Sequence, residues 1–221
     1  MADAQFVTTR GESLVSTHKV LKNTYMLLSM TLLFSAIMAG VAMATNAPPL
    51  GYGITLIGFF GLLFLTHRTA NSGFGIVSVF MLTGFMGYTL GPLINMIVGA
   101  GGSEIVVTAL GLTGVIFLSL SAYTLMTKKD FSFLSGFLMM GFWVLVGCMA
   151  LMLFDMVSSA AMLAMSVGFI IFASSLILYQ TSAIIHGGET NYILATVTLY
   201  VSLYNIFVSL LNLLTAFGGD D

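Results

Sequence analysis

Seven long apolar runs, separated by short polar segments, constrain the fold of this sequence more than any other feature. A helix that crosses the hydrocarbon core of a bilayer needs roughly 17–25 mainly apolar residues, and each run reaches that length. We therefore expect an all-α polytopic membrane protein with seven transmembrane helices over 24–217, an N-terminal tail over 1–23 and a short C-terminus over 218–221. The runs are Thr24–Ala44, Leu50–Thr66, Gly75–Val98, Ile105–Met126, Phe131–Phe154, Ala160–Ile185 and Tyr192–Phe217.

The scarcity of charge excludes other classes of protein. Asp, Glu, Lys and Arg make up 6% of the 221 residues, against about 25% in an average soluble domain, so the chain cannot cover a water-soluble surface. Six Lys and Arg residues in total are too few for a phosphate-binding patch, which excludes a nucleic-acid partner. Cys148 is the single cysteine, so an intrachain disulfide is excluded.

The basic residues predict the orientation in the membrane. With seven spans, every Lys and Arg falls on one side, and the opposite side carries only acidic residues: Glu104, Asp155, Asp220 and Asp221. Loops rich in Lys and Arg stay in the cytoplasm, so we expect a cytoplasmic N-terminus and a periplasmic C-terminus. The basic residues are Arg10, Lys19, Lys22, Arg68, Lys128 and Lys129.

The N-terminal tail carries one local signal. Thr9 and Glu12 have the spacing of a capping box, which favours a short juxtamembrane helix from about Ser13 into the first span. We expect residues 1–8 to be flexible.

The chain lacks the sequence motifs that mark the catalytic sites of enzymes. No Asp, Glu, Lys, Arg or His lies in the middle of an apolar run, whereas transporters and proton relays usually carry an ionisable group there. The sequence contains no nucleophile–base motif and no metal-ligating motif. We therefore expect a protein without catalysis, cofactor or metal.

Uncharged polar residues form a stripe along the last span. They recur at steps of four and three, which places them on one face of a helix. We favour hydrogen bonds between helices over the lining of a permeation path, because an amide in hydrocarbon must find a partner. The residues are Thr198, Ser202, Asn205, Ser209 and Asn212.

The third span carries a face of small residues: Gly84, Gly87, Gly91 and Asn95. Gly87 and Gly91 match GxxxG, and close helix packing is the favoured interpretation. A hinge is the alternative, since Pro92 should kink the helix.

Three further positions are candidates near the ends of the sixth and seventh spans. Gln180 is the most polar side chain at the end of the sixth span, and a hydrogen bond to a neighbouring helix is its simplest role. Glu189 precedes the seventh span, where it complements the helix dipole. The alternative is a pH response through His186 in this loop, or through His67 at the end of the second span, because histidine titrates near neutral pH.

Several segments resemble the Bax inhibitor (transmembrane Bax inhibitor motif) family. Residues 128–134 (KKDFSFL), 158–166 (SSAAMLAMS) and 177–180 (ILYQ) carry this resemblance. Residues 16–25 (STHKVLKNTY), 185–192 (IHGGETNY) and 199–211 are similar to the bacterial YccA branch of that family.

The resemblance implies a seven-helix fold in which the seventh helix is central. It implies binding to FtsH, the membrane-anchored ATP-dependent protease, and to its companions HflK and HflC, in the inner membrane of a Gram-negative bacterium. In that branch the protease grips the cytoplasmic tail, which corresponds here to about 1–16. The candidate contact residues in this tail are Ala2, Asp3, Thr9, Arg10 and Glu12.

Other members of the family imply an alternative function, a pH-sensitive calcium leak. They pair an Asp on the sixth helix with an Asp on the seventh, and those positions are Gln180 and Ser202 here; a latch Arg falls at about His67 or Arg68. Neither Gln nor Ser supplies the anionic oxygen that calcium prefers. We therefore expect a modulator of the protease rather than a cation channel.

Overall fold

The computed structural model describes residues 2–153 and 158–218, and these residues form seven helices and no strand. Each predicted apolar run forms one helix. Phe154, Asp155, Asp220 and Asp221, which figured in the sequence predictions, lie outside the described residues. The helices are α1 (Ala2–Ala44), α2 (Tyr52–Thr69), α3 (Phe74–Gly99), α4 (Ser103–Thr127), α5 (Leu134–Leu153), α6 (Ser159–Ile185) and α7 (Tyr192–Phe217).

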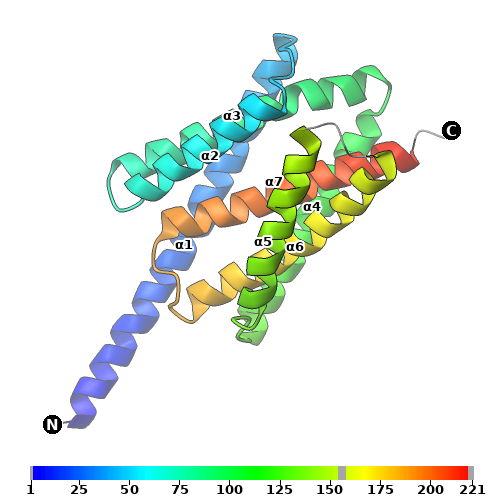
Figure 1. Cartoon of the computed structure of the whole chain (residues 1–221). Coiled ribbons are helices and arrows are strands. Elements are labelled where there is room, and N and C mark those ends of the chain that lie inside the picture. Colours follow the sequence, from blue (N-terminus) through cyan, green and yellow to red (C-terminus); the bar gives the residue numbers. More distant parts are fainter. Residues whose placement is uncertain (1, 154–157, 219–221) are drawn as a thin grey trace.

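The first helix begins much earlier than the sequence predicted. α1 is one helix from Ala2 to Ala44, so the expected helix start near Ser13 is wrong, while the flexibility expected of residues 1–8 stays a prediction. A helix that is already nucleated grows at little cost per residue, and the first proline of the chain is Pro48. The N-terminal part of α1 therefore extends beyond the other helices (Figure 1).

Three helices end in the same hydrogen-bonded turn. In each, one residue with positive φ follows the helix: Asn46 (48°), Gly101 (89°) or Gly187 (75°). After α1, the Ala47 N–H donates to the Ala42 carbonyl and the Asn46 N–H to the Met43 carbonyl, which is a Schellman motif. These turns satisfy helix carbonyls at the membrane boundary and reverse the chain within a few residues.

Six of the seven helices in the described ranges are long and apolar enough to cross a membrane. α2 is the exception, since its 18 residues include His67 and Arg68 in the last turn. The protein is thus a membrane protein with several apolar helices, and the role of α2 as a seventh span is taken up as a proposal below.

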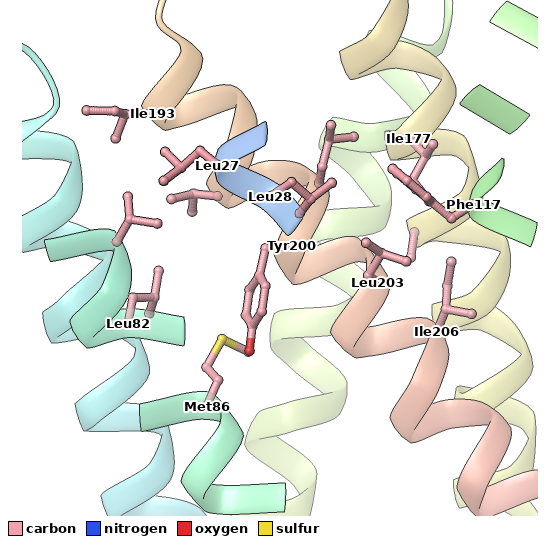
Figure 2. Packing of buried hydrophobic residues seen from close by; sticks show 14 of the residues in the cluster. Leu27, Leu28, Leu82, Met86, Phe117, Ile177, Ile193, Tyr200, Leu203 and Ile206 are labelled. Atoms are coloured by element: carbon pink, nitrogen blue, oxygen red, sulfur yellow. The ribbon is translucent and has the colours of Figure 1, made fainter. Parts of the chain in front are cut away.

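The helix α7 lies at the centre of the bundle. It packs against α1, α3, α4 and α6, and 61% of its most apolar stretch is buried, against 6% for α5. Figure 1 shows α7 passing between the other helices. Figure 2 shows Tyr200 of α7 beside Leu82 and Met86 of α3, within a cluster that also contains Leu28 of α1.

The predicted small-residue face of α3 packs closely on α1. A Cβ added at Gly87 would collide with the backbone carbonyl oxygen of Ser35, and one at Gly91 would collide with the Ala42 side chain. Asn95 continues this face, and its Nδ2 donates to the Asn46 Oδ1 at 3.1 Å. α3 runs on as one helix through Pro92. The favoured interpretation, close helix packing, is confirmed.

Candidate functional site

Three loops meet at one end of the bundle, here called the basic end because it carries Arg68, Lys128 and Lys129. Asn191 joins two of these loops: its Nδ2 donates to the Ala70 carbonyl at 3.1 Å and to the Asn71 Oδ1 at 2.8 Å. Its Oδ1 also accepts the Ile193 N–H at 2.9 Å, so the same side chain caps α7. The start of the central helix is thereby fixed to the α2–α3 loop.

Ser182 of α6 holds the third loop at the basic end. Its Oγ accepts the Phe131 N–H at 3.0 Å and donates to the Lys129 carbonyl at 3.2 Å. Ser182 is 2% exposed, so these bonds are shielded from water. The basic residues of the α4–α5 loop are therefore held against the end of α6.

The predicted loop pair, His186 and Glu189, makes only local hydrogen bonds in the structure. The His186 Nδ1 lies 2.9 Å from the Ser182 carbonyl oxygen, and the Glu189 Oε1 accepts the Asn191 N–H at 2.7 Å. Glu189 thus supports the residue that caps α7, in line with its simpler interpretation. A pH response of this loop stays a prediction.

A cavity of about 560 Å³ lies between α2, α5, α6 and α7, with part of α3 at its inner wall. α5 packs mainly on α6 and barely touches α2, which leaves this space unfilled. Most of the lining is apolar, and Phe59, Leu63 and Phe172 are typical. The polar side chains among the lining residues are Thr55, His67, Thr89, Ser135, Tyr179, Thr198, Tyr204 and Asn205.

The polar stripe of α7 does not bond to other helices in the way the sequence favoured. Thr198, Ser202 and Asn205 each donate a hydrogen bond of 2.8–3.1 Å to a carbonyl four residues earlier in α7. In a helix these local bonds satisfy a polar side chain without a second helix. Thr198 and Asn205 line the cavity, while Ser202 is fully buried and Ser209 is 4% exposed.

The interhelical bonds come from another face of α7, which sequence reasoning missed. The Tyr200 hydroxyl donates to the Thr83 carbonyl at 3.1 Å and lies 2.6 Å from the Ser35 Oγ. One turn on, the Tyr204 hydroxyl lies 3.1 Å from the Thr89 Oγ1. The four-residue spacing of these tyrosines was the available signal, because residues at that spacing share a helix face.

Gln180 and Ser202, the positions of the family's paired acids, are not joined by a hydrogen bond. The Ser202 Oγ donates to the Thr198 carbonyl at 2.8 Å. Gln180 is 6% exposed, and among the described residues its Nε2 has no partner. The simplest predicted role of Gln180, a hydrogen bond to another helix, is thus wrong for this amide nitrogen. Three other buried side-chain atoms also have no hydrogen-bond partner among the described residues: the Tyr25 hydroxyl, the Ser121 Oγ and the Thr181 Oγ1.

The remaining candidates lie at the basic end or beyond it. His67 lines the cavity, and the Arg68 guanidinium lies 5.9 Å from the centre of the Phe64 ring. The tail candidates, which the structure does not bring to the cavity, all lie on the projecting part of α1: Ala2, Asp3, Thr9, Arg10 and Glu12.

Comparisons with known proteins find similar sequences over nearly the whole chain. The family model described as "Inhibitor of apoptosis-promoting Bax1" matches residues 17–219. A protein of Escherichia coli K12 named "Modulator of FtsH protease YccA" is 54% identical over 91% of this chain and 92% of its own length. The counterpart in strain CFT073, with the same identity and coverage, is named "Inner membrane protein YccA". A Pseudomonas aeruginosa protein is 53% identical over 91% of each chain.

Proposed function

The chain belongs to the Bax inhibitor family, and from this membership we propose that it is an inner-membrane modulator of the FtsH protease without catalysis of its own. The observation that carries the proposal is the 54% identity, over nine-tenths of both chains, to the Escherichia coli protein named for that role. HflK and HflC, the companions of the protease, are proposed as part of the same assembly.

The projecting part of α1 is the proposed contact with the protease. The apolar run of this helix begins at Thr24, so residues 2–23 extend about 33 Å before it at 1.5 Å per residue. A helix of this length reaches past the lipid headgroups. We propose that all seven helices cross the membrane and that this segment is cytoplasmic, since every Lys and Arg then lies on the cytoplasmic side.

Affinity purification tests the proposal directly. The full chain would be purified in mild detergent from its native host, beside a chain that lacks residues 2–12 and a chain in which those residues form an unrelated Ala/Glu/Lys helix. We expect mass spectrometry to find FtsH with the full chain and to find much less with both variants. Recovery of FtsH at the level of an unrelated membrane protein would contradict the proposal.

The alternative, a calcium leak, has less support from the site. The two positions that carry acids in other members are neutral here, and most of the cavity lining is apolar. A chain with Gln180→Asp and Ser202→Asp, compared with the native chain for calcium flux in liposomes, separates the two functions. Flux through the native chain would favour the channel, and flux through the variant alone would indicate a scaffold that lacks its acids.

A further inference from the structure

The cavity has the depth of one leaflet of a bilayer. Its lining runs from Thr55 to His67 on α2 and from Ser135 to Val146 on α5, which corresponds to about 16–18 Å along each helix. The hydrocarbon core of a bilayer is about 30 Å thick, so one leaflet is about 15 Å. The cavity starts at the basic end, where His67 and Ser135 lie, and reaches the first turn of α2 at Thr55 and the middle of α7 at Asn205.

The volume of the cavity suits hydrocarbon chains and not a helix. The cavity measures about 560 Å³, whereas a helix about 10–12 Å wide with its side chains fills roughly 1,300 Å³ or more over the same depth. Methylene carbons pack at about 3.5–4.0 Å from their neighbours. One or two acyl chains therefore fit the space, and a transmembrane helix does not.

The cavity is accessible from the lipid. α5 barely touches α2, and the lining residues on these two helices include exposed side chains: Phe60 is 41%, Phe142 is 46% and Met139 is 69% exposed. A lipid tail can therefore enter sideways between the two helices without crossing the core around α7.

Three basic side chains and two acids, Asp130 and Glu189, lie at the basic end, where the cavity opens. None of the Lys or Arg side chains is among the lining residues, and the Lys129 Nζ lies 5.9 Å from the centre of the Tyr123 ring on α4. His67 lines the cavity at this end, and the next residue is Arg68, which is exposed. Lys128 and Lys129, also exposed, precede the start of α5. The acid of this loop, Asp130, accepts the Ser132 N–H at 2.8 Å, and this bond holds the pKa of its carboxyl below the usual range. Basic pockets of this kind between membrane helices bind the headgroups of anionic lipids.

We propose that this cavity binds one anionic phospholipid. An acyl chain of the lipid lies inside the cavity, and its phosphate lies against Arg68, His67 and the Ser135 hydroxyl. The depth, the volume, the lateral opening and the basic residues at this end of the bundle each point to this occupant. On the orientation proposed above, the lipid belongs to the cytoplasmic leaflet. Bound there, it completes the packing of α5, the least buried of the candidate spans.

Native mass spectrometry of the full chain in mild detergent tests the proposal. The probes are dioleoyl phosphatidylglycerol, which is anionic, and dioleoyl phosphatidylcholine, which has the same tails and no net charge. We expect one phosphatidylglycerol to remain bound at concentrations where phosphatidylcholine does not. Val146→Trp, which fills the cavity, should abolish this retention, and Val144→Trp should not, because Val144 is 63% exposed on the same helix and does not line the cavity.

A charge variant keeps the test decisive if Val146→Trp does not fold. Arg68→Gln, at an exposed position, should lower the preference for phosphatidylglycerol roughly fivefold, while Lys22→Gln on α1 should leave it unchanged. Retention by a folded Val146→Trp chain, equal binding of both lipids, or no effect of Arg68→Gln would overturn the proposal. A species at twice the mass without lipid would assign the cavity to a second copy. None of these measurements involves the protease, so their failure leaves the proposed modulation standing.

Discussion

The hydroxyl of Tyr200 connects three helices at the centre of the protein. It bonds to Ser35 of α1 and to the backbone of Thr83 in α3, and Tyr200 itself is 1% exposed. In hydrocarbon a polar group cannot turn to water as a substitute partner. This single side chain therefore fixes the rotation of α7 against both neighbours.

We expect Tyr200→Phe to lower the stability of the bundle by about 1 kcal/mol, in the range measured for hydrogen bonds between membrane helices. Unfolding in mixed detergent micelles measures the loss. Tyr123→Phe is the matched control, because Tyr123 is 45% exposed. Equal stability of the two variants would show that the Tyr200 hydroxyl does not connect the helices.

For Gln180 we expect that removal of the polar group raises the stability of the bundle. Its buried amide nitrogen has no partner among the described residues, and such a group costs about 1–3 kcal/mol, whereas an apolar replacement of similar shape is neutral or stabilising. We expect Gln180→Leu to melt at a higher temperature than the native chain and Gln180→Glu to melt at a lower one. A lower melting temperature for Gln180→Leu would mean that the amide is hydrogen-bonded in the membrane.

Sequence patterns predicted which residues of α7 share a face, but not which partners those residues have. The spacing of Thr198, Ser202 and Asn205 was sufficient to place them on one stripe. Whether a stripe residue bonds to its own helix or to another depends on the distance between helices, which spacing does not contain. Tyr200 and Tyr204 were missed for the same reason, since a tyrosine in an apolar run is consistent with simple core packing.

At the scale of elements, the glycines of α3 set how closely it approaches α1. Gly87 is the tightest of these positions, because an added Cβ would meet the backbone of Ser35, which cannot rotate away. Small residues allow such an approach, and dispersion contacts between the two backbones then stabilise the pair. The GxxxG spacing predicted this contact correctly, although the sequence did not identify α1 as the partner.

We expect Gly87→Ala to destabilise the protein by about 1–3 kcal/mol, the usual cost of inserting a carbon into a packed interface. Gly40→Ala on α1 is the matched control: no atom lies within 4 Å of its added Cβ, so better helix propensity should make it neutral or slightly stabilising. Thermal unfolding of both variants in the same detergent measures the difference. Similar melting temperatures would show that the helices separate easily at Gly87.

The limits of the helices were predictable where a turn residue ends them and not elsewhere. Asn46 and Gly187 ended α1 and α6 at the residues that the sequence indicated, because a positive φ there closes a specific hydrogen-bonded turn. The start of α1 was predicted wrongly, since the capping signal at Thr9 competes with the growth of a helix that is already anchored in the bundle.

At the scale of the whole molecule, the central position of α7 could be predicted from the sequence, and the cavity could not. Composition and the resemblance to the family were sufficient for a bundle around the seventh helix. The cavity depends on the gap between α2 and α5, two helices that are distant in the sequence. Their apolar runs look the same whether they pack on each other or on lipid, so no pattern in the chain could reveal it.

The number of spans decides on which side of the membrane the chain ends, and this is the last prediction. If α2 crosses the membrane, the count is odd and the C-terminus lies in the periplasm; if α2 stays at the surface, both ends lie on one side. We expect a C-terminal alkaline phosphatase fusion, which is active only outside the cytoplasm, to be active, and a C-terminal green fluorescent protein fusion to be dark. The same reporters fused after Thr127, in the α4–α5 loop, should give the reverse pattern, since Lys128 and Lys129 hold that loop inside. Green fluorescent protein that is fluorescent at both the N-terminus and the C-terminus, with an active phosphatase in the α4–α5 loop, would remove α2 from the spans. The cavity behind it would then open to the headgroup region, and the proposed lipid would have no leaflet to enter from.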